Sequence, residues 1–476
     1  MTAQEAQEHH GVHRALRTRH LMMIALGGVI GSGLFISSGY TVAQAGPLGA
    51  VVAYLIGAAV AWMVMTCLGE LAVVFPDSGG FYTYATKAIG PAVGFATAWL
   101  YWLCWVAALA SEFTASAMIA QRWLPGVDTW VWCALFAALL LALNAYSVRW
   151  FGEAEAWFSG IKVAAILVFI LLGGALILGW RAPAQQAPLL GNFLTPEGYF
   201  PTGIGGVIVT TLAVLYAFSG TELIAITAGE AADPGRTIPR ALRATLLRLV
   251  VFFVGAIVVV AALLPYPPGG EESVEGSPFV LVLERAGVPY AADLMALVVI
   301  VALLSAGNSG LYACSRLLYS LARAGQLHRA FGRTTRRGVP LLAVVVSLAG
   351  GLFSLLSSVF SPGGVYLALV SVAGFAVVAV WIVIVVAHLR HRRAYLAAGG
   401  SLRDLPYRAP GYPWVPRIAL LACVASLVVV VFDPQQVSAV LFGVPFVALC
   451  LIAYRLLPNA APPAQSPPAP PGSSPR

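Results

Sequence analysis

The chain has 476 residues, with 27 lysines and arginines against 19 aspartates and glutamates, which gives a formal net charge of +8. Hydrophobic residues make up 60% of the sequence, charged residues only 10%, and the mean hydropathy is +0.87. A water-soluble domain carries about 25% charged residues, so this composition excludes a soluble enzyme and a disordered chain. Because one membrane-spanning helix needs roughly 20 apolar residues, the sequence predicts an all-α membrane protein that crosses the bilayer many times.

Apolar runs of spanning length occur about twelve times along the chain, and each run predicts one transmembrane helix. The runs are residues 21–45, 48–75, 92–120, 129–147, 156–180, 203–229, 245–264, 291–321, 340–360, 365–388, 416–432 and 437–454. A polar N-terminal segment, residues 1–20, precedes them. A tail rich in Pro, Ala and Ser, residues 458–476, follows them, and its composition predicts disorder.

The distribution of basic residues predicts the orientation, because lysine and arginine are retained on the cytoplasmic side. With twelve spans and the N-terminus inside, all of the 27 basic residues except Arg122, Arg181 and Arg285 fall on the inner side or at inner span ends. Both termini are therefore expected in the cytoplasm, and the positive charge is expected to face lipid headgroups and no nucleic acid. The six cysteines contain no CxxC pair, and the histidines map to the inner side, so no disulfide, metal or cofactor is predicted.

Two predicted spans contain sequences that disfavour an unbroken helix. Residues 27–35 of the first span include four glycines, and residues 218–222 of the sixth place a glycine and Glu222 at mid-membrane depth. Each glycine lowers helix stability by about 1 kcal/mol relative to alanine, so both spans are predicted to unwind locally. Close packing through small residues is an alternative explanation for the first segment taken alone.

The two interrupted spans occupy the same place in two successive five-span units, residues 21–180 and 203–388. The units have opposite orientations because five is odd, and interrupted spans at matching positions of inverted repeats point to a transporter's substrate site. Free N–H groups after the first break suit a carboxylate, and the carbonyl groups before each break suit an ammonium group. The sequence therefore predicts a binding site for a zwitterion. Two further helices, at residues 416–454, follow the two repeats.

Several segments of the chain carry a family pattern, most clearly residues 19–35, 76–80, 218–224, 229–234 and 305–316. These segments resemble the bacterial amino acid permease branch of the amino acid–polyamine–organocation (APC) superfamily. Four others are similar to S-methylmethionine and lysine permeases: residues 375–381, 407–410, 432–436 and 443–450. The resemblance implies the five-plus-five inverted-repeat (LeuT-like) fold with helices 1 and 6 broken, two extra C-terminal helices, and a place in the bacterial cytoplasmic (inner) membrane.

The resemblance also implies which residues bind the substrate. The backbone at residues 31–33 would bind its carboxylate, and the carbonyl groups at residues 29–30 and 216–219 would bind its amine. Phe218 matches the aromatic position that shields the bound substrate. The implied binding residues are Val29, Ile30, Gly31, Ser32, Gly33, Tyr216, Phe218, Ser219, Gly220 and Thr221.

Ionisable side chains inside the predicted spans are expected to have a structural or functional role, because placing one charge at the centre of a membrane span costs roughly 2.5–3.5 kcal/mol of free energy. Glu70, near the inner end of its span, is expected to reach headgroups or to pair with an inner arginine. Glu112 either reads the substrate's side chain or is a protonated structural acid. Glu222 has three open roles: accepting hydrogen bonds from unwound N–H groups, carrying a coupling proton, or pairing with a cationic substrate.

Lys162, one to two turns into the fifth span, is one of only two lysines, the other being Lys87. A buried lysine releases its proton readily, whereas an arginine does not. Lys162 either snorkels to water at the inner leaflet or, as in similar sodium-independent transporters, takes the place of a sodium ion and carries the coupling proton.

These observations predict a secondary active amino acid permease, not an enzyme, that works by proton symport with alternating access. An amino acid exchanger is the alternative within the same superfamily. A membrane-embedded enzyme or a channel fits poorly, since no histidine lies at mid-membrane depth and the polar groups cluster at one depth. The expected substrate is a neutral or cationic amino acid, with S-methylmethionine and lysine- or arginine-like molecules as the chemical candidates.

Overall fold

The structure is a computed structural model that describes residues 27–75, 80–146, 148–180, 190–223, 234–266, 277–335 and 337–456. The predictions for the N-terminal segment and the tail lie outside these residues, as do residues 76–79 of one family-pattern segment and the last part of the sixth span. Within the described residues the chain is helical, with an isolated antiparallel bridge between Thr195 and Gly198.

The helices follow one another in chain order and most are long. The α-helices are α3 (Ser32–Phe35), α4 (Ser37–Val74), α5 (Phe81–Ala88), α6 (Pro91–Ala120), α7 (Thr129–Tyr146), α8 (Val148–Ile177), α9 (Gly203–Val209), α10 (Thr211–Ala217), α12 (Pro234–Leu263), α13 (Pro278–Arg285), α14 (Ala291–Arg323), α15 (Leu341–Gly351), α16 (Pro362–Ala397), α17 (Trp414–Val429) and α18 (Ser438–Leu456). Short 3-10 helices are η1 (Gly191–Phe193), η3 (Arg329–Gly332), η4 (Leu352–Ser358), η5 (Leu402–Asp404) and η6 (Val430–Phe432).

Nine helices among the described residues are long and apolar enough to cross a membrane. The difference from the predicted twelve has a local cause in each place. The fourth and sixth predicted spans correspond to the shorter apolar helices Thr129–Ala145 and Gly203–Ala217. The first and second predicted spans share the single element α4, because the connection between them is very short.

That connection is a sharp kink inside α4. Gly46 has φ 76° and ψ 170°, a conformation that a residue with a side chain rarely adopts, and Pro47 follows it. Since proline has no backbone N–H to continue the helical ladder, it fits the first turn of a new helical segment. The two predicted spans are therefore separate helical segments on either side of Gly46, as their apolar runs indicated.

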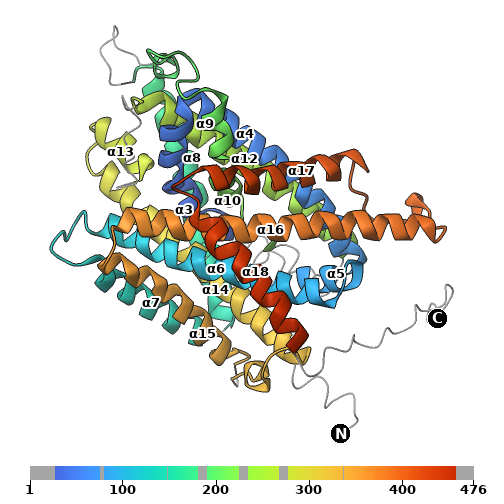
Figure 1. Ribbon diagram of the computed structural model, residues 1–476. Helices are drawn as coiled ribbons and strands as arrows, with labels where there is room; N and C mark the ends of the chain where they lie inside the picture. The colour runs from blue at the N-terminus through green and yellow to red at the C-terminus, as the bar shows by residue number, and fades with distance from the viewer. Residues whose placement is uncertain are drawn as a thin grey trace.

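The core of the molecule forms around helices from distant parts of the sequence. α6 packs against α14 and α16, while α4 packs against α12 and α10. The two short helices α3 and α10 contact each other and lie in the middle of the bundle (Figure 1). The interruptions predicted in the first and sixth spans are therefore both at the centre of the protein.

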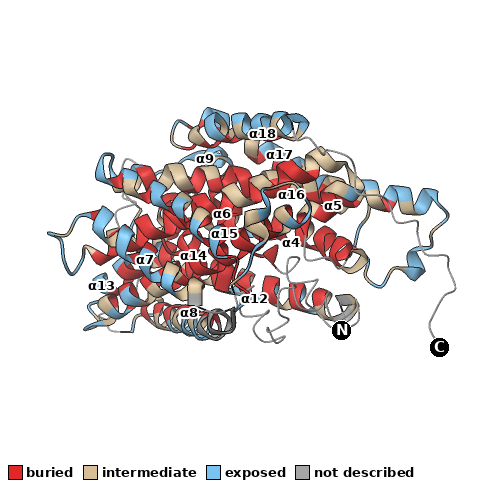
Figure 2. Cartoon of the chain, turned by 90° about the horizontal axis from the view of Figure 1, so that it is seen from below, coloured by how far each residue is buried: buried red, intermediate tan, exposed pale blue. Residues whose placement is uncertain are grey.

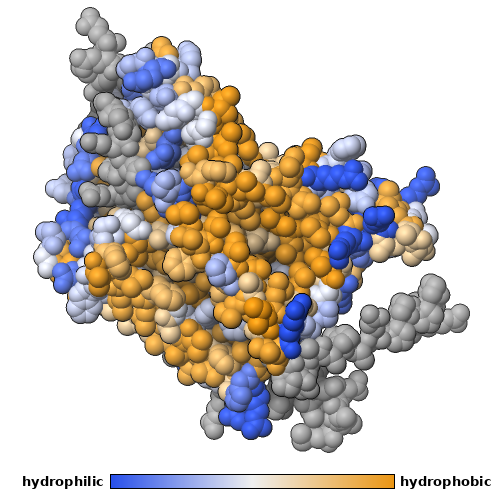
Figure 3. Space-filling model, in the orientation of Figure 1, coloured by the Kyte–Doolittle hydropathy of each residue, from blue (hydrophilic) through white to orange (hydrophobic). Residues whose placement is uncertain are grey.

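Apolar side chains are not confined to this core. Buried residues concentrate in the interior helices, whereas α17 and α18 at one side show largely exposed faces (Figure 2). These faces carry large apolar residues such as Leu421, Leu441 and Phe442. A broad hydrophobic surface runs across the middle of the molecule, with hydrophilic residues gathered mainly at its margins (Figure 3). Such a surface is too large for a soluble monomer and suits contact with lipid.

Candidate functional site

The first break lies at Ile30 and Gly31. Residues 27–29 are helical, Ile30 and Gly31 form a bend, and α3 then begins at Ser32. Glu112 of α6 closes the start of α3, because the Ser32 N–H donates to both of its carboxylate oxygens at 3.1 Å and the Ser32 Oγ donates to one at 3.0 Å. A carboxylate therefore already sits where the sequence predicts the carboxylate of a substrate, and it belongs to the protein itself.

The second break follows α10, which ends at Ala217. Residues 218–222 form turns, and Gly220 adopts φ 94°. Glu222 is fully buried and folds back on this segment, accepting hydrogen bonds from the Gly220 N–H at 2.9 and 3.1 Å. Tyr101 Oη and Trp381 Nε1 also donate to it, at 3.2 and 3.4 Å. Of the three roles considered for Glu222, this geometry favours the acceptance of unwound N–H groups.

The two breaks lie directly against each other. A Cβ atom on Gly220 would be 2.8 Å from the Gly28 carbonyl oxygen, and a Cβ on Gly33 would be 2.6 Å from the Ala217 Cα. The backbone of the first break thus contacts the backbone of the second break directly, without side chains between them. The glycine-rich first span serves as a close-packing surface as well as a break, so both explanations considered for its composition describe part of the structure.

Aromatic side chains surround the breaks. Tyr54 Oη donates to the Gly33 carbonyl at 3.2 Å, and Tyr366 Oη donates to the Ser32 carbonyl at 3.1 Å. Phe218 is fully buried, with its ring centroid 6.2 Å from that of Tyr54 and 5.0 Å from that of Phe253. Val29, Ile30 and the other predicted binding residues of the first break are buried as well. Apart from Ser219, which is half-buried, the predicted substrate-binding residues are therefore buried where the two breaks meet.

Lys162 points from α8 to the helical turn before the first break. Its Nζ donates to the Gly27 carbonyl oxygen, and the side chain is fully buried. Because the side chain is enclosed by protein and bound to Gly27, the geometry favours the interpretation that Lys162 acts at the broken helix over the interpretation that it snorkels.

A second ionisable residue on α8, Glu155, escaped the sequence analysis. It is fully buried and accepts hydrogen bonds from Ser305 Oγ at 2.7 Å and Asn308 Nδ2 at 3.4 Å. Asn144 Nδ2 on α7 donates to the Asn308 Oδ1 at 2.6 Å. The predicted fifth span began at residue 156, whereas α8 begins at Val148. The spacing of seven residues between Glu155 and Lys162, which puts both on one helix face, was the signal in the sequence.

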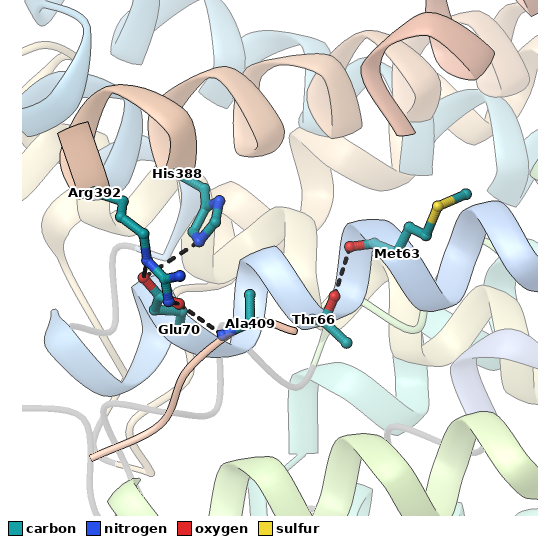
Figure 4. Close-up of polar contacts among 6 residues, drawn as sticks. All are labelled: Met63, Thr66, Glu70, His388, Arg392 and Ala409. Atoms are coloured by element: carbon teal, nitrogen blue, oxygen red, sulfur yellow. Dashed lines mark hydrogen bonds and ion pairs between the residues drawn. The ribbon is translucent and has the colours of Figure 1, made fainter. Parts of the chain in front are cut away.

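Glu70 pairs with an arginine, Arg392, which agrees with one of its two expected roles. Arg392 Nε of α16 donates to Glu70 Oε1 at 2.8 Å, a second guanidinium nitrogen binds the other oxygen, and the Ala409 N–H donates to that same oxygen at 2.7 Å. His388 Nε2 lies 3.3 Å from Oε1. Figure 4 shows these groups converging on the Glu70 carboxylate from α16 and from the segment after it. Glu70 is thus a structural residue joining α4 to α16.

Comparisons with known proteins bear on what this cluster is for. The family model described as amino acid permease matches residues 20–457. The chain belongs to the amino acid permease family. The permease is 47% identical to Amino-acid permease RocE of Bacillus subtilis (strain 168) over 448 residues, which cover 94% of this chain and 95% of that protein.

Other similar proteins have names that specify an amino acid. Lysine-specific permease LysP of Escherichia coli (strain K12) is 38% identical, with 94% of each chain covered. Histidine permease HisP of Lactococcus lactis subsp. cremoris (strain MG1363) is 36% identical, with 91% of each chain covered. The permease is therefore a multi-pass membrane transporter rather than an enzyme, as the sequence analysis predicted.

Proposed function

We propose that this permease imports an amino acid with a basic side chain across the cytoplasmic membrane of a bacterium, by proton symport with alternating access. The observation that carries the proposal is the contact between the two helix breaks, with a carboxylate held on the Ser32 N–H. A substrate carboxylate takes the place of Glu112 at this N–H group. The bundle then rocks between states open to either side because the substrate binds them unequally.

The proposal includes the architecture inferred from the sequence. We place twelve spans in the membrane, with the first and second five related as inverted repeats, both broken helices at the centre, and both termini in the cytoplasm. The apolar surface of the bundle, the separate helical segments on either side of Gly46 and the central position of α3 and α10 support this arrangement.

The charge at the centre supports a basic substrate. Around the breaks, the described residues bring together the carboxyl groups of Glu112, Glu155 and Glu222 with the amine of Lys162. The three acidic groups outnumber the one amine, so a cationic side chain that enters this region is favoured. Two of the relatives are named as lysine and histidine permeases, and their names agree with this choice.

A screen of thermal stability tests the substrate class. The purified permease is heated with each amino acid in turn and with S-methylmethionine, because a ligand that binds only the folded state raises the melting temperature. We expect lysine, arginine or histidine to give the largest increase. Stabilisation by neutral amino acids alone would overturn the assignment of a basic substrate and leave the permease function intact.

Uptake into proteoliposomes tests proton coupling. With one proton carried per substrate, an inward gradient of one pH unit supplies about tenfold accumulation, so driven uptake is expected to exceed uptake without a gradient. Counterflow of labelled against unlabelled substrate without any gradient is expected as well. Counterflow that is unaffected by a pH gradient, together with no driven accumulation, would identify an exchanger instead.

Lys162→Ala is expected to abolish the dependence of uptake on the proton gradient while leaving counterflow measurable. The reason is that the variant removes the ionisable group bound to the Gly27 carbonyl. Lys87→Ala is the matched control, because Lys87 is exposed and lies over the Phe75 ring at 4.8 Å. Full gradient dependence in the Lys162 variant would show that another group carries the proton.

Glu112→Gln tests whether Glu112 competes with the substrate carboxylate for Ser32 or reads the substrate's side chain. If Glu112 competes with the substrate carboxylate for Ser32, the neutral amide binds the N–H less strongly, since charged hydrogen bonds are about twice as strong as neutral ones. The KM for uptake is then expected to fall by about tenfold, the equivalent of 1.4 kcal/mol. A rise in KM for lysine with no change for neutral amino acids would instead show that Glu112 reads the side chain.

A further inference from the structure

Glu155 is held by neutral groups on helices that do not carry the breaks. Its two oxygens accept hydrogen bonds from Ser305 Oγ and Asn308 Nδ2 of α14, and Asn144 of α7 fixes the orientation of the Asn308 amide. The side chain is fully buried, and burial opposes the ionised form, whereas donors to both oxygens favour it. Glu155 is therefore ionised here only when a partner of opposite charge lies close by.

The partner available is Lys162, because both side chains converge on one residue of the first span. Lys162 Nζ donates to the Gly27 carbonyl. A Cβ atom on Gly27 would lie 2.3 Å from Glu155 Oε1, so the carboxylate rests against the same residue. Gly27 is thus enclosed between a fixed carboxylate and a lysine amine, in the last turn before the break.

The surroundings contain few other charges. Electrostatic interaction links Lys162 with Glu155 and with Glu112 of α6, and Glu112 has its own donors at Ser32. The neighbours of Glu155 from α14 and α7 are neutral, and α12 packs against α8 through apolar residues such as Val259. Among the described residues around the first break, Glu155 is therefore the carboxylate left to balance Lys162.

We propose that Glu155 is a positioning residue that supplies the counter-charge of Lys162, so that a Glu155–Lys162 pair holds the coupling proton at the first break. This inference rests on the proposed proton symport. With both groups ionised the pair is neutral overall, and the two side chains contact Gly27 from two sides. When Lys162 releases its proton, an uncompensated carboxylate remains, and the pair then favours taking up another proton.

The test is the pH profile of driven uptake by Glu155→Gln, which keeps the shape and the ability to accept from Ser305 but removes the charge. Without its counter-charge Lys162 holds a proton only in more acidic medium, so the profile is expected to move to lower pH. Glu155→Asp, which keeps the charge, is expected to restore the wild-type profile. An unchanged profile in Glu155→Gln would overturn the inference, because it would leave Glu155 a purely structural hydrogen-bond acceptor.

A double variant covers the case in which Glu155→Gln does not fold. Groups that act as a pair give non-additive effects, so Glu155→Gln combined with Lys162→Met is expected to recover a melting temperature above that of either single variant. A double variant no more stable than Glu155→Gln would contradict the pairing. Failure of the wild-type permease to accumulate substrate in a pH gradient would refute the proposed symport, and the melting temperatures would still decide whether the two residues are paired.

Discussion

Arg392→Met is expected to lower the free energy of unfolding by about 3–5 kcal/mol, the usual cost of removing one partner of a buried ion pair. Glu70 is buried beneath Arg392 and His388, and the backbone of Ala409 also donates to it. Without the guanidinium, the carboxylate loses its two strongest donors and stays out of reach of water. The measurement is the melting temperature of the purified permease in detergent, determined from the loss of monodisperse protein on heating.

The double variant Glu70→Leu with Arg392→Met separates charge from packing. A buried ion pair replaced by apolar residues of similar size is often neutral for stability, so the double variant is expected to recover most of the loss. An equal loss in the single and double variants would mean that Arg392 stabilises the bundle by packing, for example on the Tyr412 ring 5.0 Å away.

Arg122 provides the matched control at the surface. It pairs with Asp293 at 2.7 Å and with Glu284 at 3.4 Å, but all three side chains are partly exposed. The hydrogen bond from Arg122 to Asp293 raises the pKa of the guanidinium. Exposed pairs contribute about 0–1 kcal/mol, so Arg122→Ala is expected to leave the melting temperature nearly unchanged. A shift as large as that of Arg392→Met would show that burial is not the deciding factor.

Sequence patterns were informative where the physical signal is local. The apolar runs predicted the long helices, because hydrocarbon selects roughly 20 consecutive apolar residues whatever lies beside them. The clustered glycines at residues 27–33 and the acid within residues 218–222 predicted two interruptions, because weakened helix propensity is a property of a few adjacent residues. The structure interrupts the chain at both places.

Contacts between distant segments were not predictable in this way. Glu112 meets Ser32 across 80 positions, and Glu70 meets Arg392 across 322. No periodicity specifies which helix faces which, so the sequence supplied the ionisable residues without their partners. Glu155 lies outside the predicted fifth span for a different reason: the charged residues before position 156 weaken the apolar signal, so the predicted span begins later than α8.

The contact between the two breaks gives the second large effect. Gly220→Ala is expected to lower uptake strongly, because Gly220 adopts φ 94° and its Cβ would be 2.8 Å from the Gly28 carbonyl oxygen. The backbone strain costs about 1–3 kcal/mol. The clash adds to this strain, since the neighbouring atoms are backbone atoms of Gly28 and Val29 and no side chain can rotate away. Relief therefore requires the two breaks to separate, which removes the proposed grip on the substrate.

Gly33→Ala tests the same contact from the other side, where the added Cβ would be 2.6 Å from the Ala217 Cα. Gly205→Ala is the control, because Gly205 lies in α9 with open space around its Cβ position. We expect uptake in proteoliposomes to fall below about a tenth of the wild-type rate, the equivalent of 1.4 kcal/mol in the barrier, in both test variants and to persist in the control. A site made of backbone groups cannot keep its geometry when the two backbone segments move apart. Equal transport by all three variants would therefore show that the close approach of the breaks has no part in substrate binding.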